Sequence, residues 1–170
     1  MCAHRFSGYW KDVGTIDSLW DANMDMLSVT GGINIYDTRW PVYTRSPNRP
    51  PHVTGPEANI SHSMVTGGCR VDGTVENSVL FHSVQVEPGA LVRYSILMPG
   101  AVVRAGARVE YAILAERAEA GAGACVGTPP DGGSAWGISV VGADVRVPAG
   151  AMVPPGAMVS SDQQGGGARE

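Results

Sequence analysis

The chain has 170 residues, which is enough for one domain or for one domain and a half. It contains 23 glycines and only 6% aromatic residues, a composition that suits the thin walls of a repeat protein better than one bulky core. A net charge of −4 with no basic run argues against nucleic acid as a partner. No apolar run approaches the roughly 18 residues that a membrane span needs.

The three cysteines, Cys2, Cys69 and Cys125, are odd in number and lack the spacing of a metal site. This usage predicts a reduced, intracellular setting. The first five residues also lack the apolar core of a signal peptide. We therefore expect a cytoplasmic protein with no membrane partner.

A helix is predicted directly after Thr15, which suits an N-cap, and Asp17 falls in the first turn, where a negative charge is favourable. Residues at helical spacing follow: Ile16, Leu19, Trp20, Asn23, Met24 and Leu27. Gly31 and Gly32 are expected to end the helix. The large side chains of this segment are interpreted as helix core.

Residues 33–40 alternate between apolar and polar types and predict a strand that ends at Pro41. Residues 46–57 contain four prolines and are predicted to be an extended linker with polyproline character. The first rung of a repeat domain is expected to begin at Ala58.

From Ser78 to Val126 the sequence aligns with itself in three rows of seventeen residues. Three consecutive positions of each row show the recurrence plainly: Ser78-Val79-Leu80, Ser95-Ile96-Leu97 and Ala112-Ile113-Leu114. A fixed period of this length indicates a repeat architecture, in which each unit buries its apolar face against the next.

Within each row, aliphatic residues recur every six positions, and the same spacing returns later at Val141, Val147, Val153 and Val159. Period six fits neither a helix at 3.6 nor a long strand at two. It fits a short strand, a corner and another short strand, and three such sides make one coil of a hexapeptide parallel β-helix. A β-sandwich is disfavoured because so many sixes stay in phase.

Residues 128–139 interrupt this repeat with a stretch rich in proline and glycine, which is predicted to be a loop leaving one corner of the coil. The polar, glycine-rich tail at residues 160–170 is expected to be disordered. The β-helix domain is therefore assigned to residues 58–159.

Upstream of the coil, the cluster GYWKDVGT from Gly8 to Thr15 and the following IDSLWDANM resemble the end of the catalytic domain of glucose-1-phosphate adenylyltransferases. Further segments resemble the same family: Ile35-Tyr36-Asp37, Trp40-Pro41, Pro50-Pro51, Val65 to Cys69, Ser78 to Phe81, Ser95 to Pro99 and Gly137 to Gly142. The resemblance covers about residues 8–159. It implies a mainly β chain, with a left-handed β-helix preceded at residues 1–45 by a short helix-and-strand remnant of a nucleotidyltransferase domain.

The resemblance implies an enzyme of bacterial glycogen synthesis, which joins ATP and glucose 1-phosphate to give ADP-glucose and pyrophosphate with Mg²⁺. It further implies that Asp12 is a metal ligand and that Trp10 and Lys11 lie beside the sugar phosphate. A hard cation that neutralises phosphate oxygens prefers carboxylate ligands, so an aspartate suits this role. On its sequence context alone, Asp12 is equally a turn or cap residue before the helix.

The family places a nucleotide-binding fold before this segment, with a glycine-rich loop and a basic residue, and this sequence shows no such motif. We therefore expect the chain by itself to be inactive and Mg²⁺ not to bind it tightly. ATP and glucose 1-phosphate are expected to bind only together with that domain. The resemblance also implies a homo- or hetero-oligomer with adenylyltransferase subunits.

Two other functions stay open. His82 lies in a rung, as the general base of a hexapeptide acyltransferase does, although an outward-facing rung histidine is the simpler interpretation. Alternatively, the chain is a non-catalytic oligomerisation module whose outer faces form the interface. The cluster around Asp12 favours an adenylyltransferase segment that acts in oligomerisation or regulation, because an acyltransferase has no use for that cluster.

Overall fold

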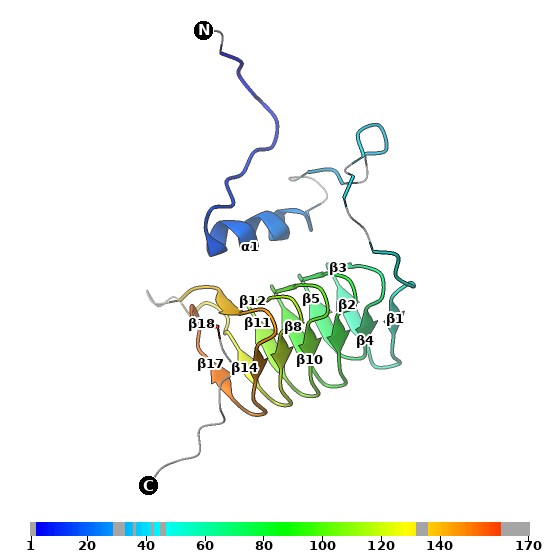
Figure 1. Ribbon diagram of the computed structural model, residues 1–170, viewed down its shortest axis with the longest axis vertical. Coiled ribbons are helices and arrows are strands. Elements are labelled where there is room, and N and C mark those ends of the chain that lie inside the picture. The colour runs from blue at the N-terminus through cyan, green and yellow to red at the C-terminus, as the bar shows by residue number, and fades with distance from the viewer. Residues whose placement is uncertain are drawn as a thin grey trace.

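Short strands joined by tight corners wind the chain into a parallel β-solenoid, seen from the side in the computed structural model of Figure 1. The structure describes residues 3–28, 33–35, 37–41, 43–44, 47–131 and 136–160. Three six-stranded parallel sheets form the sides of the prism, and the strands of each sheet come from six successive coils. The predicted hexapeptide β-helix is confirmed.

The strands of each sheet follow one another along the prism axis. Sheet A contains β1 (Val53–Thr54), β4 (Arg70–Val71), β7 (Gln85–Val86), β10 (Val102–Val103), β13 (Glu119–Ala120) and β16 (Arg146–Val147). Sheet B contains β2 (Asn59–Ser61), β5 (Thr74–Glu76), β8 (Leu91–Arg93), β11 (Arg108–Glu110), β14 (Cys125–Val126) and β17 (Met152–Val153). Sheet C contains β3 (Met64–Val65), β6 (Val79–Leu80), β9 (Ile96–Leu97), β12 (Ala112–Leu114), β15 (Ser139–Val141) and β18 (Met158–Val159).

The repeating aliphatic residues fill the prism. In sheet B, Val92, Val109 and Val126 stand in register on successive coils, and none of the three is exposed. In sheet C, Leu97 and Leu114 form the equivalent buried row. Because every coil contributes the same small set of side chains, the core is a continuous column of Val, Leu and Ala rather than a cluster of aromatic residues.

A ladder of buried serines connects the coils at the corner between sheets B and C. The Ser78 hydroxyl donates to the Glu76 carbonyl at 2.8 Å and accepts from the Ser95 N–H at 3.1 Å. The Ser95 hydroxyl donates to the Arg93 carbonyl at 2.7 Å and accepts from the Ala112 N–H at 3.2 Å. These side chains satisfy backbone groups that the short strands leave unpaired in the interior.

Replacing Ser95 with alanine is expected to destabilise the solenoid by about 1–3 kcal/mol, because the Ala112 N–H then stays buried without an acceptor. Urea unfolding followed by circular dichroism measures the change. Ser160→Ala, at an exposed site, is the control and should stay within about 0.5 kcal/mol of the wild type. Equal stabilities of the two variants would contradict this account of the ladder.

Upstream of the solenoid lies one helix of the described residues, α1 (Ile16–Asp25). Its start is confirmed: the Thr15 side chain accepts from the Ser18 N–H at 3.1 Å, and the Ser18 hydroxyl accepts from the Thr15 N–H at 3.0 Å, which forms a capping box. The helix ends at Asp25, before the predicted stop at Gly31 and Gly32, which lie outside the described residues. No helix in the described part of the chain is long and apolar enough to cross a bilayer.

The strand predicted at residues 33–40 is wrong for the residues that the structure describes. The chain folds there into successive turns, in which the Asp37 N–H donates to the Asn34 carbonyl and the Trp40 N–H to the Asp37 carbonyl, both at 3.2 Å. Local hydrogen bonds of this kind replace the ladder that a strand requires.

Two boundaries of the solenoid differ in detail from the sequence assignment. Strand β1 falls inside the segment 46–57 assigned to a linker, so strand pairing starts before Ala58. The loop predicted at residues 128–139 falls in the connection between β14 and β15, but Ser139 already belongs to β15. The predicted disordered tail lies outside the described residues beyond Ser160.

Candidate functional site: the helix-docking face of the solenoid

One side of the prism has an apolar exterior. The outward row of sheet C consists of Met64, Val79, Ile96, Ile113, Val140 and Met158. Ile96 is fully buried and Ile113 is only 3% exposed, although both point away from the prism axis. The exteriors of sheets A and B carry charged side chains instead, such as Arg104, whose guanidinium lies 2.8 Å from carboxylates of both Glu87 and Glu119. Sheet C is therefore the face that another element covers.

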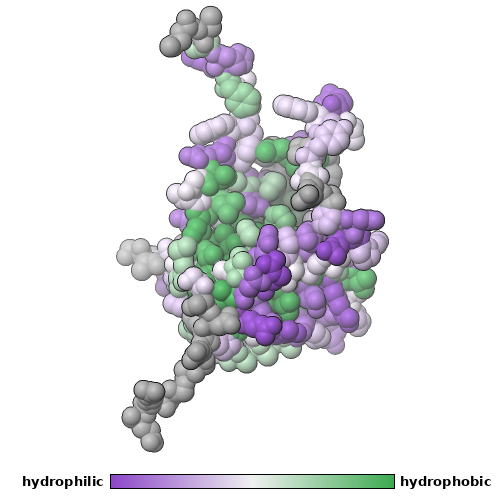
Figure 2. Space-filling view, in the orientation of Figure 1, coloured by the Kyte–Doolittle hydropathy of each residue, from purple (hydrophilic) through white to green (hydrophobic). Residues whose placement is uncertain are grey.

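Helix α1 is the element that covers sheet C. Ile16, Leu19, Trp20 and Met24 of the helix pack against a cluster centred on Ile96, Ile113 and Ile138. The Trp20 indole N–H also donates to the Tyr94 carbonyl at 2.7 Å, which ties the helix to the corner between sheets B and C. In Figure 1 the helix lies alongside the stack, and in Figure 2 apolar side chains gather where the two meet.

Four aromatic rings close one side of this interface. Tyr94 and Tyr111, from adjacent coils, stack with ring centroids 4.8 Å apart. Trp20 reaches Tyr111 from the helix at 5.9 Å, and Trp136 meets the same ring edge-on at 5.3 Å. Trp136 comes from the connection between β14 and β15, and its indole N–H donates to the Thr128 carbonyl at 2.9 Å. The upstream helix and the downstream connection thus meet on the same pair of tyrosines.

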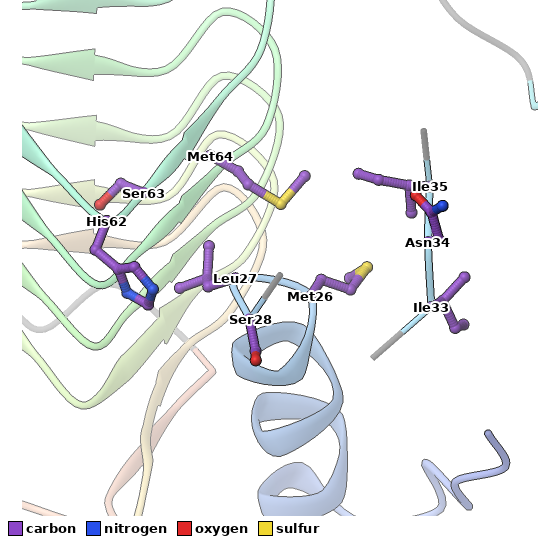
Figure 3. A pocket seen from close by; sticks show the side chains of 9 residues that line it. All are labelled: Met26, Leu27, Ser28, Ile33, Asn34, Ile35, His62, Ser63 and Met64. Atoms are coloured by element: carbon purple, nitrogen blue, oxygen red, sulfur yellow. The ribbon is translucent and has the colours of Figure 1, made fainter. Parts of the chain in front are cut away.

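At the carboxyl end of α1 the interface opens into a hollow of about 260 Å³ with a mixed polar and apolar lining. Met26 and Leu27 from the helix end, Met64 from β3 and Ile35 from the turn lie around it, and His62 stands at its margin (Figure 3). The hollow is smaller than the roughly 300–1,000 Å³ that encloses a drug-sized ligand. No lysine or arginine lines it among the described residues, so it lacks the cations that would bind the phosphates of a nucleotide.

The residues predicted to bind substrate and metal lie just before α1. Trp10 is 76% exposed. The Lys11 ammonium lies 2.7 Å from Asp25 and 3.0 Å from Asp21, so it is paired with the polar face of the helix. One carboxylate oxygen of Asp12 accepts the Gly14 N–H at 3.1 Å, which is the turn-capping role that sequence context also allowed.

Asp12 supplies one carboxylate toward the Mg²⁺ that the resemblance implies. Among the described residues there is no group of three or more His, Cys, Asp or Glu side chains that could hold a metal ion. Mg²⁺ requires six oxygen ligands in near-octahedral geometry. The described residues therefore do not fit a Mg²⁺ site by themselves, and further ligands would have to come from elsewhere.

The ion pair on the polar face of α1 has a defined pH range. The hydrogen bond from the Lys11 ammonium to Asp25 raises the pKa of Lys11 to about 12. The same bond lowers the pKa of Asp25 below its ordinary value of 3.8. A lowered carboxyl pKa stabilises the fold above the unfolded value and loses that contribution as pH falls. The raised pKa of Lys11 stabilises the fold at lower pH, and this stabilisation is lost as pH rises from 10.5 through about 12.

Replacing Lys11 with methionine is expected to raise the pKa of Asp25 toward its ordinary value, because the largest cause of its depression is removed. An NMR titration of the carboxyl carbons measures the change. Asp37 is the internal control, since its pKa is lowered by the hydrogen bond from Arg39 and should not move. An unchanged Asp25 titration would mean that the pair does not form in solution.

His82, the candidate acyltransferase base, is half-buried beside a cavity of about 770 Å³. Its ring nitrogen lies 3.4 Å from the Ser83 hydroxyl, which is a neutral partner. Arg49 is the only charged side chain that lines the cavity among the described residues, and no carboxylate lines it. A general base is usually oriented by a further hydrogen-bonded group, and these contacts do not supply a carboxylate for that task.

The docking face was missed in the sequence, although a signal was present. Several strands of sheets A and B place a polar residue outward beside an inward apolar one, as in Arg70-Val71 and Gln85-Val86. Every strand of sheet C instead places two apolar residues side by side, as in Ile96-Leu97 and Ile113-Leu114. Neighbouring residues of a strand point to opposite faces. Adjacent apolar residues that recur at the same place in each coil therefore indicate a sheet covered on both sides.

Comparison with known proteins agrees with this architecture. Residues 51–137 match the model of the family described as GlmU-like, C-terminal hexapeptide. Glucose-1-phosphate adenylyltransferase of Geobacillus stearothermophilus is 52% identical over 91 residues, which is 54% of this chain and 24% of that protein. The proteins of the same name from Clostridium novyi and Clostridium botulinum are 49% and 47% identical over 92 and 95 residues, covering 54% and 56% of this chain and 24% and 25% of theirs. The matched region thus spans about a quarter of the length of these relatives.

Proposed function

Because the chain belongs to the family of GlmU-like C-terminal hexapeptide domains, we propose that it is the C-terminal segment of a glucose-1-phosphate adenylyltransferase. The reaction joins ATP and glucose 1-phosphate to give ADP-glucose and pyrophosphate in glycogen synthesis. The nucleotide-binding domain is supplied from outside these residues, either as the rest of a longer chain or as a separate subunit. Trp10, Lys11 and Asp12 complete the substrate and Mg²⁺ sites of that domain.

The docked helix carries this proposal. The apolar face of α1 packs on sheet C, so the segment that resembles a catalytic domain is attached to the solenoid rather than tethered loosely to it. The same segment exposes large aromatic side chains: Trp10 is 76% exposed, Trp40 85% and Tyr43 92%. Exposed apolar groups of this size are typical of surfaces that a partner covers. The nucleotide-binding domain is that partner.

Oligomerisation and regulation belong to the same proposal. Strands β16, β17 and β18 lie at the edges of their sheets. Met152 of β17 and Met158 of β18 are each 68% exposed, which supports association of subunits through this end. Regulation is supported by the cavity beside His82, where Arg49 is the one charged lining residue that the structure describes. A cavity with this charge favours an anionic ligand.

The test is to pair the chain with the missing part of a relative. The purified chain is mixed with the fragment of the Geobacillus stearothermophilus enzyme that precedes the matched region, and ADP-glucose and pyrophosphate are measured with ATP, glucose 1-phosphate and Mg²⁺. The mixture is expected to be active, whereas neither part alone exceeds a buffer control. A chain carrying Leu19→Asp, which places a charge in the helix interface, is expected not to restore activity.

Other results separate the alternatives. Turnover by the chain alone would contradict the need for a second domain. A lack of both complex formation and activity in the mixture, together with self-association in analytical ultracentrifugation, would support the non-catalytic oligomerisation module. Binding of acetyl-CoA in calorimetry, abolished by His82→Ala, would support the acyltransferase.

A further inference from the structure

Two tyrosines of the solenoid have an unusual backbone conformation. Tyr94 has φ of 45° and Tyr111 has φ of 50°, both in the left-handed region, at the corner between sheets B and C. The preceding coil has Asn77 at the same corner, with φ of 47°. Asparagine tolerates this conformation well, whereas a bulky side chain is rarely found there. The backbone conformation at positions 94 and 111 would therefore favour asparagine or glycine over tyrosine.

At this corner the Tyr111 ring lies in the cluster that packs against α1, whereas Tyr94 meets the helix through its backbone carbonyl. The rings stack on each other, and Tyr111 contacts Trp20 of the helix and Trp136 of the downstream connection. The carbonyl of Tyr94 accepts the Trp20 indole N–H. Burial raises the pKa of the Tyr111 hydroxyl, in agreement with a ring enclosed by the interface. Strained residues persist where the surrounding contacts offset their cost, and here those contacts are with the helix.

The connection that carries Trp136 has no part in the solenoid repeat. In one coil, Tyr111 alone forms the corner between β11 and β12. In the next coil, residues 127–138 separate β14 from β15 at the same corner. This connection brings Trp136 against Tyr111 and buries Ile138 to 5% exposure within the cluster that receives the helix. The tyrosines at left-handed corners and the added length of the connection therefore both serve the same interface.

We propose that Tyr94, Tyr111 and Trp136 form an aromatic clamp that holds α1 on sheet C, and that the clamp is maintained at a cost to the stability of the solenoid. The clamp fixes the position of whatever is attached to the helix. It deepens the proposed function, because it names the residues that would set the orientation of the nucleotide-binding domain. It does not depend on the reaction, since its contacts lie within this chain.

Hydrogen exchange measured by mass spectrometry on the full chain tests the clamp without an activity assay. Trp136→Ala is expected to accelerate exchange of the α1 amides about tenfold or more, while the amides of β8 to β12 keep the wild-type rate. Trp40→Ala makes the same chemical change at a tryptophan that is 85% exposed, and it should leave α1 unchanged. Unaltered exchange in α1, or an equal acceleration throughout the solenoid, would overturn the proposal.

A second pair of variants tests the cost to the solenoid. In the wild-type background, Tyr111→Asn is expected to accelerate exchange in α1. In a Leu19→Asp background, where the helix is already released, the same substitution removes the ring contacts to Tyr94 and Trp136 but no helix contact, and it relieves the left-handed strain. It should therefore lower the melting temperature of the solenoid clearly less there than in the wild-type background. An equal fall in both backgrounds would refute the clamp, even if the pairing assay showed the proposed function to be correct.

Discussion

Replacing Gly121 with alanine is expected to destabilise the solenoid by about 3 kcal/mol or more. A Cβ atom at this position would lie 2.6 Å from the Val147 carbonyl oxygen and 2.7 Å from the Ala149 nitrogen. Both are backbone atoms of the next coil, so they cannot move aside as the end of a flexible side chain can. The clash can be relieved only by shifting β13 from β16, which weakens the ladder between them.

Gly106→Ala is the matched control for this prediction. Gly106 has φ of +69°, but a Cβ atom there would meet no heavy atom within 4 Å. Its cost is therefore limited to the conformational preference, about 1 kcal/mol. Urea unfolding of both variants gives the comparison. If Gly121→Ala were no more destabilising than Gly106→Ala, the close approach of the two coils would not exist in solution.

Gly121 also shows where the sequence repeat stops being informative. In the aligned rows its place is taken by Glu87 and Arg104, so the pattern gives no reason for glycine there. The restriction comes from the backbone of the next coil at Pro148 and Ala149, which lie 27 and 28 residues further along the chain. It depends on how tightly the two corners stack. A periodic pattern predicts which side chains point inward, because that depends on strand geometry alone. It does not predict the distance between corners.

For helix α1 and the segment after it, features that depend on neighbouring residues were likewise predictable, and features that depend on distant residues were not. The start of α1 was predictable because the Thr15 and Ser18 capping box lies within four residues. The strand expected at residues 33–40 also rested on a local alternation, but a strand needs a neighbouring strand to pair with. The described residues there form turns instead, stabilised by hydrogen bonds such as that from the Asp37 N–H to the Asn34 carbonyl.

The candidate site was predictable only in part. The resemblance directed attention to Trp10, Lys11 and Asp12, but their contacts in the structure are to solvent, to α1 and to a turn. The docking face depends on contacts such as that between Trp20 and Tyr94, which are 74 residues apart. Local spacing predicted that Trp20 lies in a helix core, and it could not reveal that the other half of that core is the outside of the solenoid.

Replacing Ile113 with aspartate is expected to release α1 from the solenoid. Ile113 is 3% exposed, yet it points outward from sheet C into the cluster with Leu19 and Trp20. A carboxylate buried there without a partner costs more than the helix contacts contribute. We expect α1 to detach while the prism stays folded, because the inward neighbours Ala112 and Leu114 are unchanged. The docking free energy should fall by about 3 kcal/mol, which corresponds to roughly 100-fold faster exchange of the α1 amides.

Met158→Asp provides the control, since Met158 occupies the same outward row of sheet C, in register with Val140, but is 68% exposed. The two variants carry the same new charge on the same face and differ only in whether the helix covers the site. Met158→Asp should therefore retain the α1 exchange rates of the wild type, while Ile113→Asp loses them together with activity in the paired adenylyltransferase assay. If Ile113→Asp kept slow exchange in α1, the outer face of sheet C would not be what holds the helix, and the attachment of a catalytic domain through it would have to be abandoned.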